Sequence, residues 1–327
     1  MLRTVILGTG SYAPARVLTN SDLEKMVATN GPWIVSRTGI EERRIAEPGE
    51  ATSDMAAAAA RNALELAGVE AAELDLVIVG TVTGDTPTPS CAAFVQAKIG
   101  AANAFAFDVS AACAGSLYGL SIADQFIKTG KVRRALVIGA ETLSRVVDWT
   151  NRETCVLFGD GAGAMVLGPG EDEGRGVLAT KLRTDGAMTG ILGIYGGGSL
   201  QPFSEEVLQS NRHKIKMRGR EVYKVATRLL PEIVAETLGL AGLTARDVDH
   251  VIAHQANARI IESVLKGLDI PFEKCWMNIA RFGNTSSASL PITLDEANRA
   301  GRLKRGDVIS MMAIGAGMTW GGAVVRW

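Results

Sequence analysis

Residues 105–127 read FAFDVSAACAGSLYGLSIADQFI, which predicts a strand that turns directly into a helix. The apolar run Phe105–Val109 is typical of a buried strand, whereas the apolar residues after Gly115 recur at helical spacing. Between the two elements lie only small residues and one thiol, that of Cys113. The pattern therefore places Cys113 at or near the first turn of a helix.

This position favours a nucleophilic role for Cys113. Unpaired N–H groups and the positive end of the helix dipole stabilise a thiolate, and the small neighbours leave room for a substrate carbonyl. The ordinary alternative is an inert buried cysteine, and we expect it for Cys91, Cys155 and Cys275, which lack this setting. The spacing of the four cysteines fits neither a disulfide framework nor a CxxC metal site.

Along the whole chain, short β-branched runs alternate with helical patterns, which indicates α/β layers with buried sheets. Ser53 or Asp54 is expected to cap an alanine-rich helix, and Gly68 to end it. The expected strands are Thr4–Leu7, Leu76–Val79, Phe105–Val109, Ala135–Ile138, Val248–Ala253 and Val308–Met312.

A faint internal repeat suggests two duplicated halves. Residues 73–80 (ELDLVIVG) resemble 247–254 (DVDHVIAH), and 130–139 (GKVRRALVIG) resemble 301–310 (GRLKRGDVIS). When the chain is aligned with itself at the offset of the second pair, Cys113 is aligned with Asn284. We place the boundary in the glycine-rich stretch at 168–176, which gives halves of 1–172 and 173–327.

Length, charge and hydropathy limit the class of protein. The 327 residues suffice for a large core, and a formal net charge of −1 gives no bulk basicity for nucleic-acid binding. No apolar run approaches the ~18 residues of a membrane span, and the N-terminus lacks a signal-peptide pattern. The sequence thus predicts a cytoplasmic protein.

Two further polar residues are candidates for the same site as Cys113. His254 closes an apolar strand, although a histidine there can also be a plain structural group. Asn284 precedes the small run Thr-Ser-Ser-Ala-Ser, which mirrors the surroundings of Cys113; an asparagine in a turn is the alternative. Its amide could stabilise an enolate or oxyanion.

Two glycine-rich motifs are not expected to bind nucleotides. Residues 8–13 (GTGSYA) fit GxGxxA, but Pro14 follows and no helix begins there. Residues 159–164 (GDGAGA) lack the Lys-Ser/Thr of a phosphate loop. No residues have metal-ligand spacing, so we expect no metal and no cofactor.

Taken together, the motifs resemble the β-ketoacyl-acyl carrier protein synthase III family, the initiating condensing enzymes of bacterial fatty acid synthesis within the thiolase superfamily. The resemblance runs nearly end to end. It rests on residues 33–40 (WIVSRTGI), 110–115 (SAACAG), 158–164 (FGDGAGA), 254–257 (HQAN), 283–289 (GNTSSAS) and 317–321 (GMTWG).

The resemblance implies a five-layered αβαβα fold, a homodimer and a role for each candidate residue. Cys113 would take an acyl group from acyl-CoA as a thioester. His254 and Asn284 would bind the thioester oxygen of malonyl-acyl carrier protein during decarboxylation. The backbone N–H groups of Cys113 and Ala316 would form the oxyanion hole, although the family commonly has glycine in place of Ala316.

The resemblance also implies binding residues. Trp33 and Arg152 would sandwich the CoA adenine, and Arg37 would contact a CoA phosphate. The ordinary alternatives are an exposed tryptophan that belongs to the core of an interface, and arginines that are solvated surface charges. Thr88, at the tip of a loop that crosses the dimer interface, and Ile314, where the family often has an aromatic residue, would shape the acyl pocket. The acidic carrier protein would dock on Lys224, Arg259 and Lys266.

Other functions remain open at this point. A starter-loading ketosynthase or acyltransferase of polyketide or specialised lipid synthesis would use the same residues. A degradative thiolase would need a second catalytic cysteine, and no cysteine occurs near Gly317. An inactive partner subunit would be expected to lack the nucleophile.

Overall fold

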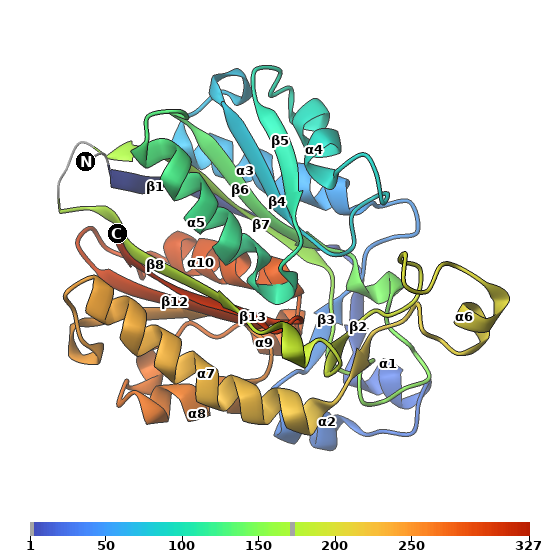
Figure 1. Cartoon of the computed structure of the whole chain (residues 1–327). Coiled ribbons are helices and arrows are strands. Elements are labelled where there is room, and N and C mark those ends of the chain that lie inside the picture. Colours follow the sequence, from blue (N-terminus) through green and yellow to red (C-terminus); the bar gives the residue numbers. More distant parts are fainter. Residues whose placement is uncertain (1–2, 171–173) are drawn as a thin grey trace.

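The computed structural model describes residues 3–170 and 174–327, which form two large sheets, two small two-stranded sheets (β2-β3 and β9-β10) and three layers of helices (Figure 1). The first sheet has the strand order β1-β7-β6-β4-β5. β7 is antiparallel to β1 and β6, whereas β6, β4 and β5 are parallel to one another. The strands are β1 (Arg3–Tyr12), β7 (Gly161–Gly170), β6 (Ala135–Glu141), β4 (Leu76–Gly80) and β5 (Phe105–Val109).

The second sheet repeats this arrangement in the order β8-β13-β12-β11. β13 is antiparallel to β8 and β12, and β11 is parallel to β12. Cys275 forms a parallel bridge to Val251 of β11, at the position that β5 has in the first sheet. The strands are β8 (Gly176–Thr184), β13 (Thr319–Arg326), β12 (Val308–Gly315) and β11 (His250–Ala253).

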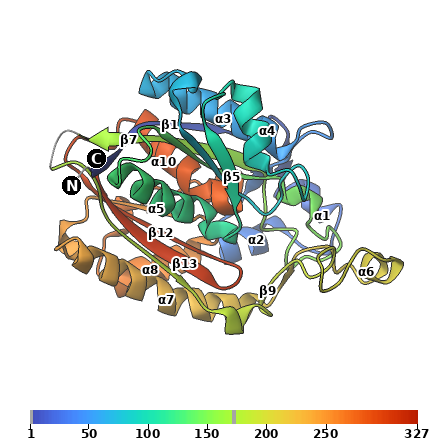
Figure 2. The same ribbon diagram turned by 45° about the horizontal axis from the view of Figure 1, so that its top comes forward.

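Helices fill the space between the sheets and cover both outer faces (Figure 2). The central pair, α5 (Gly115–Lys128) and α10 (Ser289–Arg299), is mostly buried between the sheets. α3 (Thr52–Ala67) and α4 (Cys91–Ile99) cover the first sheet, and α7 (Gly219–Leu240) and α8 (Ala258–Gly267) cover the second. This is the expected αβαβα fold with two duplicated halves.

Shorter elements lie beside the strand ends where the two halves meet. The segment carrying α6 projects from the body of the molecule (Figure 1). These elements are β2 (Val17–Thr19), α1 (Asn20–Glu24), α2 (Gly31–Thr38), β3 (Glu42–Arg44), β9 (Leu192–Gly193), α6 (Glu205–Gln209), β10 (Lys216–Met217) and α9 (Ile279–Phe282).

The sequence located the strands better than the helix caps. All six expected strands are present, and Gly68 ends α3 in the left-handed conformation at φ 62°. The expected cap at Ser53 or Asp54 is wrong, because Ala51 is the N-cap residue and α3 begins at Thr52. The Asp54 carboxylate instead accepts the Ala51 N–H at 2.9 Å from inside the first turn.

The two glycines of the GxGxxA motif lie within β1 and serve close packing. A Cβ on Gly8 would come within 2.5 Å of the Ala63 carbonyl oxygen, and one on Gly10 within 2.3 Å of the Ala63 nitrogen. The two glycines therefore let β1 approach α3, and no nucleotide-binding turn exists there. The boundary expected between residues 172 and 173 lies outside the described residues.

Candidate active site

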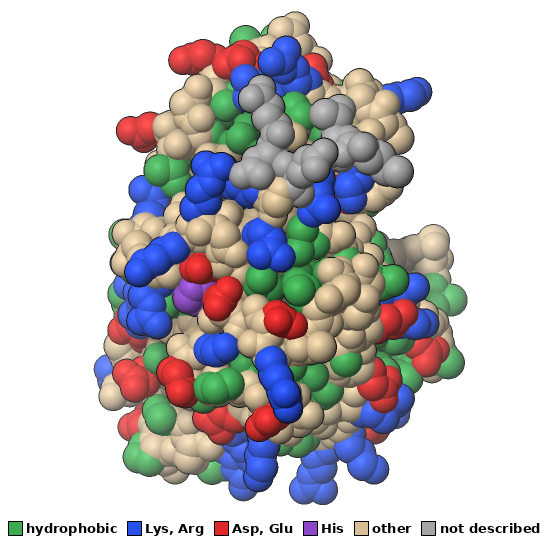
Figure 3. All heavy atoms as spheres, turned by 90° about the vertical axis from the view of Figure 1, so that its left-hand side faces the viewer, with side chains coloured by type: hydrophobic (Ala, Val, Ile, Leu, Met, Phe, Trp, Pro, Cys, Tyr) green, Lys and Arg blue, Asp and Glu red, His purple; other side chains and the backbone are tan. Residues whose placement is uncertain are grey.

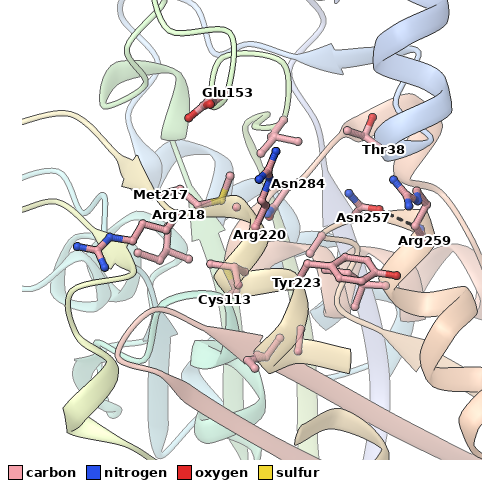
Figure 4. A pocket seen from close by; sticks show the side chains of 18 of the residues that line it. Thr38, Cys113, Glu153, Met217, Arg218, Arg220, Tyr223, Asn257, Arg259 and Asn284 are labelled. Atoms are coloured by element: carbon pink, nitrogen blue, oxygen red, sulfur yellow. Dashed lines mark hydrogen bonds between the residues drawn. The ribbon is translucent and has the colours of Figure 1, made fainter. Parts of the chain in front are cut away.

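A cavity of about 790 Å³ reaches Cys113, His254 and Asn284 together, although these residues are far apart in the chain. Figure 4 shows Cys113 and Asn284 in this cavity. Cys113 follows β5, His254 follows β11, and Asn284 precedes the central helix α10. The carboxyl ends of parallel strands meet at one edge of a sheet, and duplication brings the two edges face to face. The fold thus brings together the three residues that the sequence singled out.

Cys113 lies in a single 3₁₀ turn, Ala112–Ala114, that leads directly into α5. Ala112 has a φ of 45°, a conformation unusual for a residue with a side chain. A Cβ on Gly80 would lie 2.5 Å from the carbonyl carbon of Gly115. The small residues around the thiol therefore let β4 and α5 meet, besides leaving space for a substrate.

The ionisation of Cys113 differs from the expectation based on its helix. Burial raises the pKa of the thiol to about 12, a hydrogen bond from Ser286 opposes the rise, and the charge of Glu141 adds to it. The helix N-terminus therefore does not by itself keep the pKa of this thiol low. Ionisation of Cys113 is therefore disfavoured unless another group takes up its proton.

The His254 ring is oriented by Ser289 at the start of α10. Nδ1 lies 2.5 Å from the Ser289 hydroxyl, which also accepts the Gln255 N–H at 3.2 Å. The hydroxyl proton of Ser289 is thus free to be donated to Nδ1, which leaves the ring proton on Nε2. Burial lowers the pKa of His254 to about 3, so the ring is neutral and can donate from Nε2 at ordinary pH.

The side chain of Asn284 is fixed by its own loop. Oδ1 accepts the Ser286 N–H at 2.8 Å, which directs the amide NH₂ group away from the loop as a donor. Its backbone N–H donates to the Leu157 carbonyl at 2.8 Å. Asn284 and His254 can therefore both present neutral donors to the cavity.

The expected oxyanion hole lies where β12 ends beside the Cys113 turn. A Cβ on Gly315 would come within 2.5 Å of the Cys113 nitrogen, so only glycine allows this approach. Ala316 follows directly but does not line the cavity. The β-carbon that distinguishes it from the family's glycine therefore does not narrow the cavity.

The residues expected to bind CoA lie at the mouth of the cavity, with one difference from the prediction. Trp33 and Arg37 line the cavity, but Arg152 stacks directly on Trp33 with its guanidinium 4.8 Å from the ring centroid. A base held between two partners needs about 7 Å, at van der Waals contacts near 3.5 Å. Arg152 and Trp33 must separate before an adenine can enter between them.

The three expected docking cations lie on the two outer helices of the second sheet. Lys224 is on α7, and Arg259 and Lys266 are on α8; all three are exposed. Arg259 also lines the cavity and lies 5.8 Å from the Tyr223 ring centroid. The face that carries both chain ends, by contrast, mixes cations with carboxylates (Figure 3).

Several cavity residues were missed by the sequence reasoning. Arg218 and Arg220, at the start of α7, line the cavity with Met217 (Figure 4). The basic run that contains them, MRGRE at 217–221, was the available signal. Two arginines there give the cavity mouth further positive charge for an anionic substrate.

The inner wall of the cavity is apolar. Ile314 and Met318 line it, as expected for Ile314. Thr88 is exposed on the loop between β4 and α4 and does not line the cavity of its own chain. Any role of Thr88 in an acyl pocket would therefore have to be exercised on a second copy.

The described residues contain neither a metal-binding cluster nor a membrane-spanning helix. No group of three or more His, Cys, Asp or Glu side chains is arranged to hold a metal ion. Likewise, none of the helices there is long and apolar enough to cross a membrane.

Known proteins resemble this chain over its full length. Two family profiles match, 3-oxoacyl-[acyl-carrier-protein (ACP)] synthase III at residues 107–186 and its C-terminal counterpart at 238–327. The β-ketoacyl-[acyl-carrier-protein] synthase III of Caldanaerobacter subterraneus is 52% identical over 322 residues, which cover 98% of this chain and 97% of that protein.

Solved structures give the same result. The 3-oxoacyl-[acyl-carrier-protein] synthase III of Aquifex aeolicus superimposes with a TM-score of 0.93 at 48% identity, covering 99% of this chain and 100% of that one. The priming β-ketosynthase of the R1128 polyketide pathway gives 0.91 at 37% identity, covering 99% and 96%. The chain belongs to the β-ketoacyl-[acyl-carrier-protein] synthase III family.

Proposed function

We propose that this enzyme, an acyltransferase, condenses an acyl-CoA starter with malonyl-acyl carrier protein to 3-oxoacyl-acyl carrier protein and thereby initiates fatty acid synthesis. The observation that carries the proposal is the convergence of Cys113, His254 and Asn284 in one cavity with a cationic mouth. That set contains a nucleophile and two neutral hydrogen-bond donors, which are the groups that acyl transfer followed by decarboxylation requires.

In the first half-reaction, the Cys113 sulfur attacks the acyl-CoA carbonyl and CoA leaves as a thiolate. The backbone N–H groups of Cys113 and Ala316 are proposed to hold the oxyanion of the tetrahedral intermediate, although Ala316 does not itself line the cavity described above. The acyl chain lies against the apolar wall that includes Ile314. Trp33, Arg37 and Arg152 bind the nucleotide end once Trp33 and Arg152 have separated.

In the second half-reaction, His254 and Asn284 donate hydrogen bonds to the thioester oxygen of the malonyl group. Loss of CO₂ places negative charge on that oxygen, and two fixed donors in a buried site stabilise it. The carbanion attacks the acyl-Cys113 carbonyl, and the thiolate leaves. Decarboxylation supplies the carbanion, so the reaction needs no base for an α-proton and no cofactor.

A product assay tests this function. Incubation of the enzyme with acetyl-CoA and malonyl-acyl carrier protein is expected to give CO₂ and a 3-oxobutyryl carrier in equal amounts. Product formation without release of CO₂, or no product from any acyl-CoA, would contradict the assignment.

A homodimer and a division into halves are part of the proposal. β5 is an edge strand with Phe105 48% exposed, and an unpaired apolar edge favours pairing with a second copy. The equal strand orders of the two sheets support halves of 1–172 and 173–327. A cytoplasmic location remains a prediction from the sequence.

A starter-loading ketosynthase of polyketide synthesis is the second candidate, and the R1128 likeness is the observation in its favour. Its lower identity, 37% against 52% for the Caldanaerobacter relative, favours fatty acid synthesis over this alternative.

Charge reversal at Arg259 is expected to impair the carrier-protein step more than the acyl-CoA step. The carrier is acidic, and Arg259 is exposed at the cavity mouth. Arg259→Glu should raise the KM for malonyl-acyl carrier protein about tenfold, and wild-type KM should rise steeply with salt. Steady-state kinetics with carrier-bound and CoA-bound malonate measures the difference.

The matched control is Arg246→Glu. This exposed arginine lies before β11, at the opposite end of that strand from His254, and carries the same charge change. Equal losses in the two variants, or equal losses with malonyl-CoA and malonyl-carrier in Arg259→Glu, would contradict a docking role.

Thr88 is expected to make the acyl pocket of the partner copy larger than a phenylalanine would. Each additional buried methylene of a starter then gains about 0.8 kcal/mol in an apolar pocket. Wild type should accept isobutyryl- and hexanoyl-CoA beside acetyl-CoA, and Thr88→Phe should restrict it to acetyl-CoA. Competition kinetics among the three thioesters measures the preference. A wild type limited to acetyl-CoA, or an unchanged preference in Thr88→Phe, would contradict a role of Thr88 in the acyl pocket.

A further inference from the structure

A buried carboxyl group that the mechanism above leaves unused lies behind Cys113. Glu141 is the last residue of β6 and is completely buried. Its oxygens accept hydrogen bonds from the Val82 N–H and from hydroxyl groups, and none of the salt bridges found among the described residues includes it. The hydroxyls are those of Thr81, Thr83, Ser286 and Ser287.

The protons of three of these hydroxyls have fixed positions. Thr81 Oγ1 accepts the Thr83 N–H at 3.1 Å, and Thr83 Oγ1 accepts the Thr142 N–H at 2.9 Å. Each threonine therefore donates its own proton to Glu141. Ser287 donates to the Gly80 carbonyl oxygen and lies farther from the carboxyl group, at 3.3 Å.

Among these hydroxyls, that of Ser286 is the one that acts on the Cys113 thiol as well as on Glu141. Its hydroxyl lies 3.0 Å from Glu141 Oε1, and the turn that carries it packs against the turn of Cys113. There Ser286 lowers the pKa of the Cys113 thiol against the larger effect of burial. Its backbone N–H holds Asn284 Oδ1 at 2.8 Å, and its φ is 52°. One hydroxyl proton cannot serve carboxylate and thiolate at once.

Among the described residues around Glu141, Cys113 is a titratable group that can exchange a proton with it. The 81–83 segment and the turn Ser286–Ala288 present hydroxyls and backbone groups, and the turn Ala112–Ala114 presents Cys113. His254 contacts Ser289 instead. Glu141, Ser286 and Cys113 thus form a chain of three groups, with Ser286 in the middle.

We propose that Glu141 is a positioning residue that takes up and returns the proton of Cys113 through the Ser286 hydroxyl; this inference rests on Cys113 being the nucleophile. As sulfur attacks the acyl-CoA carbonyl, the S–H bond breaks and its proton passes to Ser286 Oγ. The proton of Ser286 moves to Glu141 Oε1 at the same time. One negative charge moves from carboxylate to sulfur, and none is added to the buried site.

The protons balance over the full catalytic cycle. The new bond joins Cys113 Sγ to the acyl carbon, the bond to the CoA sulfur breaks, and the CoA thiolate leaves and takes a proton from water. Glu141 remains protonated in the acyl-enzyme. When condensation expels the Cys113 thiolate, the proton returns through Ser286 and restores the thiol and the carboxylate.

Burial explains why a shared proton suits this site. It raises the pKa of Cys113 to about 12 and that of Glu141 to about 7, because each anion loses its hydration. Two neighbouring anions would repel each other, whereas the exchange keeps a single charge throughout. It also supplies the group that takes up the proton of Cys113.

Single-turnover transfer of acetyl from acetyl-CoA to Cys113, followed by rapid quench and peptide mass spectrometry, tests the relay. Glu141→Gln and Ser286→Ala should each slow transfer about 10²-fold, the lower range for positioned acid–base groups. The double variant should be no slower than either single variant, because both remove one pathway. Alkylation of Cys113 by iodoacetamide should slow in parallel.

The pH profile gives a second readout. Only ionised Glu141 can accept a proton, so wild-type transfer should fall as pH drops through about 7, the pKa of Glu141. Glu141→Gln should lack this decline. A carboxylate that acted by charge alone would instead make Cys113 more reactive when neutralised, because its charge raises the pKa of the thiol.

Ser287→Ala is the matched control, since the neighbouring serine also contacts Glu141 but directs its proton to Gly80; it should stay within about threefold of wild type. Ser286→Ala keeps the carboxyl group and its other donors, so it carries the test even if Glu141→Gln lowers the melting temperature. Faster acylation in Glu141→Gln, additive losses, or equal effects of the two serine variants would overturn the relay. A wild-type Cys113 that takes no acyl group would contradict the proposed function and the relay with it.

Discussion

Cys113→Ser is expected to reduce condensation by at least about 10³-fold, the range seen when a covalent nucleophile is removed. Serine is nearly isosteric, but its alkoxide is much harder to form than a thiolate, and the site already raises the pKa of the thiol to about 12 by burial. The measurement is the rate of 3-oxoacyl-carrier formation, with thermal unfolding as the check on folding.

The same variant separates the two half-reactions. Since the hydroxyl that replaces the thiol cannot take up the acyl group efficiently, acyl transfer should be lost, while binding of malonyl-carrier beside His254 and Asn284 should remain. A turnover rate of the variant within tenfold of wild type would contradict the assignment of Cys113 as the nucleophile.

His254→Ala and Asn284→Ala are expected to reduce decarboxylation of malonyl-carrier by about 10²–10³-fold each, the usual effect of removing one oxyanion donor. Acyl transfer to Cys113 should persist, because neither donor acts in that step. Labelled CO₂ release and acyl-enzyme formation, measured separately, give the two rates. The pKa of His254 is lowered to about 3, so its titration should cause no change in the decarboxylation rate near neutral pH.

Ser289→Ala is the companion to His254→Ala. It keeps the imidazole but removes the hydroxyl that lies 2.5 Å from Nδ1 and fixes the ring proton on Nε2. Its decarboxylation rate should fall less than that of His254→Ala. If His254→Ala blocked acyl transfer and spared decarboxylation, the assigned roles would be reversed.

Local patterns in the sequence predicted the layers of the fold and the three central residues. Apolar β-branched runs marked each expected strand, and the FAFDV–SAACAG junction marked the turn of Cys113. The repeat pointed from Cys113 to Asn284 because the two halves share one strand order. The N-cap of α3 was misplaced because the Ala51 N–H is satisfied by the carboxylate of Asp54, three residues further along the chain, and not by the side chain of the cap residue itself.

The electrostatics of the site could not be predicted in the same way. Glu141 ends the apolar run ALVIGAE, a signal that was available, but its donors come from residues 81–83 and 286–287 and meet only in the folded chain. The pKa of Cys113 depends on burial and on those same partners, so the helix start alone gave the wrong expectation. Direct stacking of Arg152 on Trp33 likewise depends on the packing of distant segments.

The mass of the peptide that contains Cys113, measured after incubation with acetyl-CoA and again after addition of malonyl-acyl carrier protein, tests the central claim most directly. We predict that Cys113 gains one acetyl group, that Cys91, Cys155 and Cys275, buried outside the cavity, gain none, and that malonyl-carrier removes the group with release of CO₂. A Cys113 that remains unmodified while 3-oxoacyl-carrier accumulates, or an acetyl group that malonyl-carrier does not remove, would contradict the account.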